Sequence, residues 1–288
     1  MLKRTGNYLT HQHPDSAPAA TRKASLELES KGYTHIAGVI TAAEVDALAS
    51  DVSAIFDALP PDGRAAGLRS PEEDEMYRYE LLNRSRLCQA LVENEIMLST
   101  IEPLLGNDCH VIANTGWRNP AGHQGADQGQ AWHIDAGPHV PLPEGVEWPA
   151  DIPHPVFAIG THVFLKDCKL ADGPTGVIPY SHLSGRFPPR ARPFDRDLTF
   201  KSNAVVPLIA KAGDAVLFVS DIWHRRLPAG PAQSGRFFVQ IHYARRDIAQ
   251  RLRSTSHVNH LHEDTKNHAL QPRQRTVIGI HPNSFYDG

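Results

Sequence analysis

The sequence predicts a mainly β protein with flanking helices, whose core is an antiparallel sandwich or jelly roll. Seven short apolar runs, separated by Gly and Pro, follow one another from Cys109 to Ala244. No helical crossover lies between them, although a parallel sheet of βαβ units would require one after each strand. Two helical tracts come before the first run. The runs are CHVIANTGW (109–117), AWHID (131–135), PVFAIGTHVFLKD (155–167), GVIPYSH (176–182), NAVVPLIA (203–210), DAVLFVSDIWH (214–224) and RFFVQIHYA (236–244).

One domain is expected, because 288 residues with 41% hydrophobic content can bury a single sizeable core. A polar, poorly ordered lead-in occupies residues 1–22, and the domain occupies 23–288. Its parts are a helical segment over about 23–106, a jelly-roll core over about 107–246 and a polar C-terminal extension over 247–288 that lacks a clear period.

The first predicted helix covers residues 41–60. Thr41 and Glu44 are spaced as a capping box, and two prolines, Pro60 and Pro61, end the helix. Apolar residues recur between them at helical spacing: Val45, Leu48, Val52, Ile55, Phe56 and Leu59.

The second helical tract and two loops complete the outline. The tract covers about 85–105 and ends at Gly106, with Pro103 as a kink or the start of a final turn. Residues 119–130 are a flexible polar linker. Residues 137–155 contain six prolines, so we expect a stiff loop that covers the mouth of a site.

Composition favours small-molecule chemistry in a reducing, cytoplasmic setting. The net charge is −3 with interspersed signs, so no basic stripe is available for nucleic acid and no polybasic segment for a membrane surface. Cys88, Cys109 and Cys168 have no C-x-x-C spacing, which argues against a disulfide framework or a thiolate metal site. Neither a membrane span nor a secretory signal is visible. Oligomeric state stays open.

Histidine–acid pairs are the candidate chemistry of a chain with 17 histidines. The motif His-x-Asp occurs as His13/Asp15, His133/Asp135 and His262/Asp264. Roughly one such pair is expected by chance, so the motif alone proves little. The first pair lies in the lead-in and the last close to the C-terminus, and both are best interpreted as solvated. Only the middle pair is followed by a series of predicted strands.

The middle pair has the spacing of two metal ligands. In an extended strand, residues i and i+2 share a face, so His133 and Asp135 can present a nitrogen and an oxygen to one ion. A third ligand must then come from a distant strand, and two histidines with one carboxylate suit iron(II) and oxygen chemistry. The apolar run 214–224 ends at His224. Arg236 opens the next strand and shares a face with Phe238, Gln240 and His242.

In this order the motifs resemble the phytanoyl-CoA-dioxygenase-like family of iron(II)- and 2-oxoglutarate-dependent oxygenases. The matching features are His133-x-Asp135, DGPTGVIPYSH (172–182), GDAVLFVSDIWH ending at His224, Arg236, and KGYTHIAGVITAAEVDALASDV (31–52) as the opening strand and helix. The resemblance covers roughly residues 30–246 and implies a double-stranded β-helix, the cupin-like jelly roll. Two departures are Tyr180 in place of a usual glycine and Arg225-Arg226 in place of small residues after His224.

The resemblance implies a role for each matching residue. His133, Asp135 and His224 would ligate iron(II), and no catalytic residue is implied beyond them. Arg236 would bind the distal carboxylate of 2-oxoglutarate. Gln130 and His162 would be further contacts of this cosubstrate, or else a solvated loop glutamine and a core histidine.

Candidate substrate-binding residues are chosen from side chains near these motifs. They are Arg118, Trp117, Arg186 and Arg226. The arginines would bind an anionic substrate or else be solvated, as would Arg225. Trp117 would line the pocket or serve packing.

The implied activity is hydroxylation of an unactivated C–H bond in a small, carboxylate-bearing molecule, an amino-acid derivative or a secondary-metabolite intermediate. Oxygen is consumed, and 2-oxoglutarate is decarboxylated to succinate. Desaturation, cyclisation and epimerisation remain open, whereas the carboxylate of Asp135 argues against halogenation. A cupin-like isomerase or hydrolase without 2-oxoglutarate is a second alternative, which Arg236 argues against. A catalytically silent binding protein is a third, but no ligand residue is lost.

Overall fold

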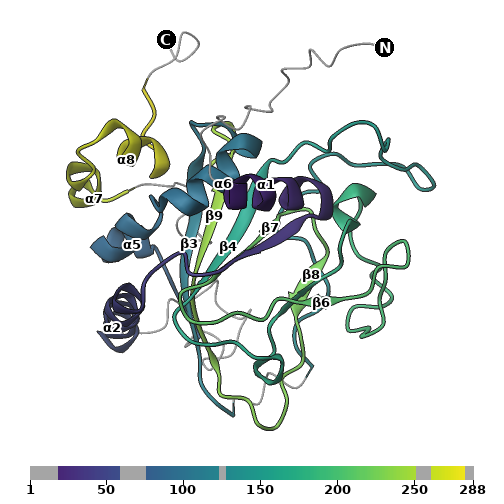
Figure 1. Ribbon diagram of the computed structural model, residues 1–288, viewed down its shortest axis with the longest axis horizontal. Coiled ribbons are helices and arrows are strands. Elements are labelled where there is room, and N and C mark those ends of the chain that lie inside the picture. The colour runs from purple at the N-terminus through teal and green to yellow at the C-terminus, as the bar shows by residue number, and fades with distance from the viewer. Residues whose placement is uncertain (1–18, 59–75, 123–127, 251–260, 283–288) are drawn as a thin grey trace.

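The computed structural model describes residues 19–58, 76–122, 128–250 and 261–282. Within these ranges the strands form two facing antiparallel sheets (Figure 1). The strands are β1 (Tyr33–Ile36), β2 (Tyr77–Tyr79), β3 (His110–Asn119), β4 (Ala158–Phe164), β5 (Thr175–Val177), β6 (Val206–Pro207), β7 (Ala215–Val219), β8 (His224–Arg226) and β9 (Arg236–Ala244).

The larger sheet has six strands in the order β1-β7-β4-β9-β3-β2, and the smaller sheet has three in the order β6-β5-β8. Neighbours in space are distant in sequence, as in the pairing of β4 with both β7 and β9. An isolated bridge between His133 and His224 extends the smaller sheet beyond β8. Two facing sheets with this strand exchange confirm the predicted jelly roll.

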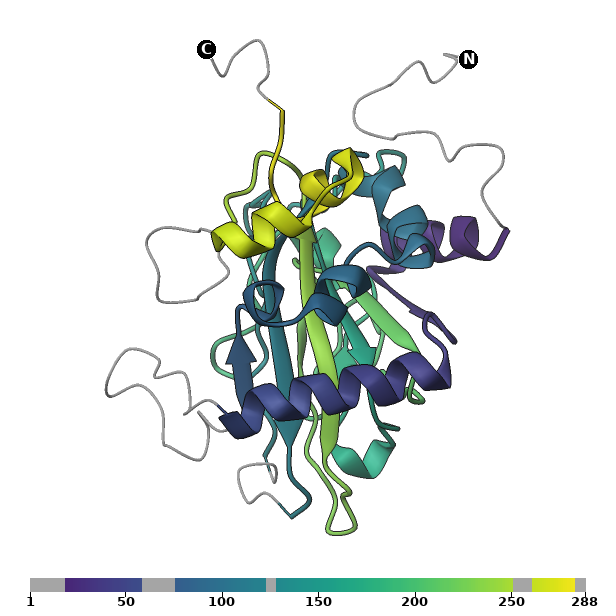
Figure 2. The same cartoon turned by 90° about the vertical axis from the view of Figure 1, so that its left-hand side faces the viewer.

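Helices cover the outer face of the larger sheet, as Figure 2 shows for α2 crossing the strands. Gly116 of β3 leaves room for this packing, since a Cβ there would lie 3.1 Å from Val52 and 3.3 Å from Phe56 of α2. The helices are α1 (Ala19–Lys31), α2 (Ala42–Ala58), α4 (Leu81–Arg84), α5 (Arg86–Leu91), α6 (Glu95–Leu105), α7 (Glu263–His268) and α8 (Pro272–Val277), with 3-10 turns η2 (Leu170–Asp172) and η3 (Ser181–Ser184).

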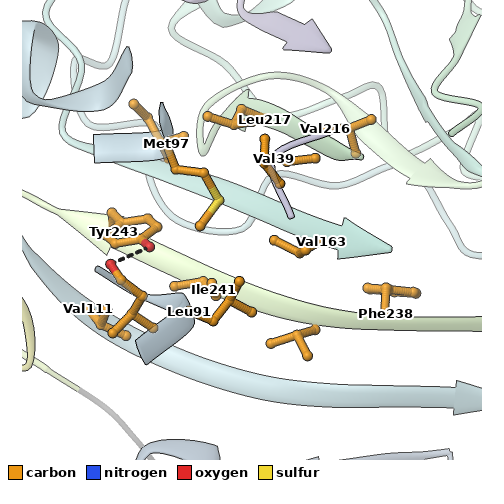
Figure 3. Close-up of a cluster of buried hydrophobic side chains, with 14 of the residues drawn as sticks. Val39, Leu91, Met97, Val111, Val163, Val216, Leu217, Phe238, Ile241 and Tyr243 are labelled. Atoms are coloured by element: carbon orange, nitrogen blue, oxygen red, sulfur yellow. Dashed lines mark hydrogen bonds between the residues drawn. The ribbon is translucent and has the colours of Figure 1, made fainter. Parts of the chain in front are cut away.

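The main hydrophobic core lies between these helices and the larger sheet. Figure 3 shows part of it, with Met97 of α6 above Val163 and Ile241 of the sheet. The hydroxyl of Tyr243 donates to the carbonyl of Val92 at 2.9 Å, so this buried phenol is satisfied by the end of α5. The outer face of the sheet is therefore filled by packing, which leaves the inner face to form the site.

The first predicted helix is confirmed as α2. The Glu44 carboxylate accepts from the Thr41 amide at 2.7 Å and the Glu44 amide donates to the Thr41 hydroxyl at 3.3 Å, which is the expected capping box. The second tract is two helices rather than one, because the Asn94 side chain accepts from the Met97 amide and begins α6 separately from α5.

The structure differs from the sequence expectations at several other elements. Residues 19–22, expected in the lead-in, belong to α1, whose pattern carries no strong apolar face. The run 131–135 is not a strand, although an isolated β-bridge forms at His133. The three-residue strand β2 was not predicted. The lead-in before residue 19 and the residues that end the first helix lie outside the described residues.

None of the helices in the described ranges has the length and apolar character of a bilayer-spanning helix.

Candidate metal centre

The candidate site begins with two segments that pair through their backbones. The His133 amide donates to the His224 carbonyl at 3.0 Å, and the His224 amide donates to the His133 carbonyl at 3.0 Å. A third bond runs from the Asp135 amide to the Ser220 carbonyl at 3.2 Å. This antiparallel register places three side chains, His133, Asp135 and His224, on the inner face of the barrel.

These three side chains converge. One nitrogen or oxygen from each of His133, Asp135 and His224 lies within 4.8 Å of the others. The Asp135 Oδ1 atom is 3.3 Å from His224 Nε2 and 3.9 Å from His133 Nε2. This is the spacing of a ligand set around a shared point.

The histidine tautomers suit metal binding. His133 Nδ1 contacts the Ala131 carbonyl at 2.8 Å, and His224 Nδ1 contacts the Ile222 carbonyl at 2.9 Å. Because a carbonyl oxygen only accepts, each Nδ1 carries a proton, and each Nε2 is the nitrogen that faces Asp135. Fixing a ligand imidazole through its other nitrogen is the usual outer-shell arrangement of metal sites.

The charges of the triad suit a cation. Burial would raise the pKa of Asp135, but the nearby His224, His242 and His133 outweigh it and hold this pKa well below its usual range. Burial, together with His224, lowers the pKa of His133 to about 4. Near neutral pH the triad therefore offers an anionic oxygen and a neutral imidazole nitrogen from His133.

The triad opens into a cavity of about 420 Å³ between the two sheets. One wall comes from β9, where Arg236, Phe238, Gln240 and His242 alternate with residues of the outer face. The volume falls within the range typical of small-molecule sites.

Arg236 lies inside this cavity as a buried cation. Its Nε and Nη2 atoms donate to the Asn119 side-chain oxygen at 3.1 and 3.0 Å. No carboxylate of the described residues lies within ion-pair distance of it. Burial and the neighbouring Arg226 lower its pKa to about 9, so the guanidinium still carries its charge near neutral pH.

His162 lies on β4 among the rings of Phe218 and Phe238, with centroids at 5.2 and 4.5 Å. Neither of its ring nitrogens has a hydrogen-bond partner among the described residues. Burial, followed by the nearby His242 and Arg236, lowers its pKa well below the ordinary value. His162 is thus a neutral ring at the cavity wall whose polar atoms are unsatisfied.

Other expected site residues also line the cavity. The Gln130 side-chain oxygen accepts from the Arg226 amide at 3.2 Å, which holds Gln130 at the end of β8. Trp117 donates from Nε1 to the Gln240 side-chain oxygen at 2.7 Å. Arg226 is on the same face of β8 as His224, and its buried Nε and Nη2 have no hydrogen-bond partner within the described ranges.

Arg118 and Arg186 do not line this cavity, so the substrate-binding role expected of them gains no support. Arg118 points to the opposite face of β3, where it pairs with Asp57 at 2.8 Å. The Arg186 guanidinium donates to the Val146 carbonyl at 2.9 Å in the proline-rich loop. For Arg118, sequence proximity to a motif did not reveal this direction, because neighbouring residues of a strand face opposite sides.

The C-terminal His-x-Asp pair is exposed to solvent. His262 and Asp264 are exposed at α7, where Asp264 pairs with Arg86, as the solvated interpretation expects. His13 and Asp15 lie outside the described residues.

The cavity residues to which sequence reasoning gave no role include His242, Tyr79 and Thr115. His242 lies with Nδ1 3.8 Å from Asp135 Oδ2, and Tyr79 and Thr115 line the wall formed by β2 and β3. For His242 the signal was present, because it shares the period-2 face of Arg236 in the run 236–244. For Tyr79 the strand itself is too short to show a pattern.

Known proteins share this architecture. The structure of the epimerase SnoN in complex with Fe3+, alpha ketoglutarate and nogalamycin RO superposes with a TM-score of 0.59 at 18% identity, covering 80% of this chain and 85% of that chain. HygX from Streptomyces hygroscopicus with nickel, 2-oxoglutarate and hygromycin B gives 0.58 at 16% identity, covering 83% and 96%. The non-heme monooxygenase ThoJ in its nickel complex gives 0.55 at 18% identity, covering 79% of each chain.

No curated protein matches the chain. The family described as phytanoyl-CoA dioxygenase (PhyH) matches residues 28–236, which include the helical segment, His133, Asp135, His224 and Arg236. The chain therefore belongs to the phytanoyl-CoA dioxygenase family.

Proposed function

We propose that this protein is an iron(II)- and 2-oxoglutarate-dependent hydroxylase of a small, carboxylate-bearing molecule. One observation carries the proposal: His133, Asp135 and His224 meet in the same cavity as the buried, uncompensated cation Arg236. A divalent cation complements the anionic carboxylate of Asp135 in the triad, and a dicarboxylate cosubstrate complements the guanidinium of Arg236.

The donor set fits iron. Two imidazoles held through Nδ1, with Nε2 directed to the shared point, and one ionised carboxylate would leave coordination positions on the cavity side for a chelating cosubstrate and oxygen. Iron(II) bound by His133, Asp135 and His224 would supply the oxygen activation that oxidatively decarboxylates 2-oxoglutarate and oxidises a substrate C–H bond.

The protein would bind the cosubstrate through the distal carboxylate of 2-oxoglutarate. Arg236 presents a planar fork to the distal carboxylate, while Asn119 holds the guanidinium in place from behind. Gln130 and the unsatisfied nitrogens of His162 are the proposed neighbouring contacts. Because the amide oxygen of Asn119 is neutral, it leaves the positive charge of Arg236 available to the cosubstrate. A carboxylate partner would neutralise that charge.

Substrate binding is proposed for Trp117 and Arg226. The hydrogen bond to Gln240 fixes the Trp117 ring at the cavity wall, where it offers an apolar surface. Arg226 adds a further buried cation, whose Nε and Nη2 find no partner in the part of the chain that the structure describes, and this favours a substrate that carries a carboxylate. Together they would exclude water and orient the C–H bond toward the metal.

The decisive experiment is anaerobic titration of iron(II)-loaded protein with 2-oxoglutarate, followed by the visible charge-transfer band of the chelate. Asp135→Ala should abolish iron retention, and Arg236→Ala should weaken cosubstrate affinity while iron is retained. Arg118→Ala is the matched control, since this arginine lies outside the cavity. A missing band in the wild-type protein would favour the isomerase or hydrolase alternative.

Hydroxylation is proposed over other outcomes of the same chemistry, and the mass of the product distinguishes them. Mass spectrometry of a turned-over substrate should show the gain of one oxygen atom. An unchanged mass would instead indicate epimerisation, the reaction in the name of SnoN, and the loss of two hydrogens would indicate desaturation or ring formation.

We also propose a reducing, cytoplasmic setting. Cys88, Cys109 and Cys168 are all buried free thiols, and burial raises the pKa of Cys88 and of Cys109 to about 12. Such thiols are inert packing residues rather than redox or disulfide partners.

A further inference from the structure

A second histidine–aspartate contact lies beside the metal centre. The His139 Nδ1 atom donates to Asp221 Oδ1 at 2.7 Å, and the His139 amide lies 3.4 Å from Asp221 Oδ2. Both side chains are largely buried, with 15% and 8% of their surfaces exposed. Neither residue lines the cavity, so neither is placed to touch substrate or cosubstrate.

The position of this contact in the chain is informative. His139 comes four residues after Asp135, and Asp221 comes three residues before His224. The contact therefore joins the same two segments that carry the metal ligands. The backbone pair of His133 with His224 joins one end of the two segments, and the bond from Asp135 to Ser220 joins the first segment near its middle to the residue just before Asp221.

We infer that His139 and Asp221 are positioning residues, which together form a clasp that sets the distance between Asp135 and His224. The backbone bond from Asp135 to Ser220, at 3.2 Å, holds the main chain on one side of the ligand. The clasp holds the chain on the other side of Asp135, because His139 follows Asp135 in the sequence. With both ties present, the Asp135 carboxylate has little freedom to swing away from the shared point.

The surroundings support a built contact rather than an incidental one. The His139 ring stacks on Phe157 with centroids 4.8 Å apart and planes at 8°, so its orientation is fixed from a second side. Gly137 has φ +104, and a Cβ at this position would lie 2.4 Å from Asp221 Oδ1. Only glycine lets the chain approach the carboxylate this closely.

This inference rests on the proposed metal site, and its test uses cobalt(II) as the probe. His139→Phe keeps a ring on Phe157 but removes the donor to Asp221. We expect the cobalt dissociation constant to rise about 10- to 100-fold and the visible spectrum of the saturated protein to change. His139→Asn, whose amide can still donate, should restore affinity to within about threefold of the wild type.

The control separates positioning from general stability. His35 contacts Asp214 at 2.9 Å in the same kind of pair, away from the ligand segments. His35→Phe should leave cobalt affinity and spectrum unchanged, while thermal unfolding of the metal-free variants reports the stability cost of each. If His139→Phe does not fold, Asp221→Asn serves instead, because it keeps the side-chain volume and one acceptor while weakening the clasp.

The outcomes are distinguishable. Equal affinities and spectra for the wild type and His139→Phe, or for Asp221→Asn where that variant is used, would overturn the clasp alone. A wild-type protein that binds no cobalt would overturn the proposed metal site and the clasp with it.

Discussion

At the scale of single residues, the metal centre depends on short-range contacts that orient each side chain. Both ligand histidines donate from Nδ1 to the carbonyl two residues earlier in the chain, Ala131 for His133 and Ile222 for His224. Each local contact fixes one tautomer and directs Nε2 to the shared point. The ligand atoms are thus oriented before any metal binds.

Asn119 is predicted to control the charge available at Arg236. Asn119→Ala removes the partner of Nε and Nη2, so we expect 2-oxoglutarate affinity to fall about fivefold through looser positioning. Asn119→Asp should lower it by about tenfold or more, because the new carboxylate would neutralise the guanidinium and repel the cosubstrate. Isothermal titration calorimetry of the metal-loaded variants with 2-oxoglutarate measures both affinities. Similar losses in the two variants would contradict the electrostatic part of this prediction.

Arg226 is predicted to act on the substrate rather than on the cosubstrate. A panel of small carboxylates and their methyl esters should stimulate 2-oxoglutarate turnover by the wild type, with the acids preferred. Arg226→Gln removes the cation whose N–H groups are unpaired in the cavity, so this preference should fall about tenfold or more while 2-oxoglutarate affinity changes little. A large loss of cosubstrate affinity would instead assign Arg226 to the same carboxylate as Arg236.

At the scale of elements, β1 is attached to β7 by their register and by one capping carboxylate. Asp214 accepts from the Gly38 amide, the Lys211 amide and His35, each at 2.9 Å. Burial would raise the pKa of Asp214, but these hydrogen bonds outweigh it and lower this pKa below its ordinary value. The carboxylate therefore stabilises the turn that begins the strand leading to His224.

The pH dependence of this turn follows from the sign of that shift. A lowered pKa in the folded state stabilises the protein above the unfolded value, about 3.9, and the contribution is lost as pH falls through the folded value. Asp214→Asn should cost about 1 kcal/mol near neutral pH, and less below pH about 3.5. Urea unfolding of the wild type and of Asp214→Asn, near neutral pH and below pH about 3.5, measures the difference in their free energies of unfolding. A cost that is the same at both would contradict the prediction.

At the scale of the whole molecule, stability and metal binding are carried by different parts of the fold. The main core contains residues of the helices and the larger sheet, and none of His133, Asp135 and His224 belongs to it. The metal site is therefore a feature of the inner face, supported by a core that does not depend on it.

Metal removal is predicted to lower stability without unfolding the protein. The metal-free protein should keep its far-UV circular dichroism, because the core is complete without the ligands. Metal at about 100 times its dissociation constant should add about 2.7 kcal/mol, a rise of several degrees in Tm. Differential scanning calorimetry with and without a chelator checks both parts. Loss of the circular dichroism signal on chelation would show that the metal is structural.

The sequence predicted those features that short-range pattern encodes. The capping box and apolar period of α2, the β runs from 109 to 244 apart from 131–135, and the chemical identities of the candidate ligands were readable, because helix and strand periods are local. The order of the motifs along the chain also indicated the family. Local pattern failed where elements are very short, as at β2, or where a cap divides one apolar tract, as at Asn94.

By itself, then, the sequence determined the fold class, the family and the residue types available for metal and cosubstrate binding. Tertiary structure alone decided which of them meet: His133 and Asp135 with His224, Arg236 against Asn119, and His139 against Asp221, while Arg118 and Arg186 point elsewhere. The reason is that these contacts join residues far apart in the chain, and their directions depend on strand register and face. For the residues in strands, such as Arg236 and Asn119, a shift of one residue in register would turn the side chain to the other side of the sheet.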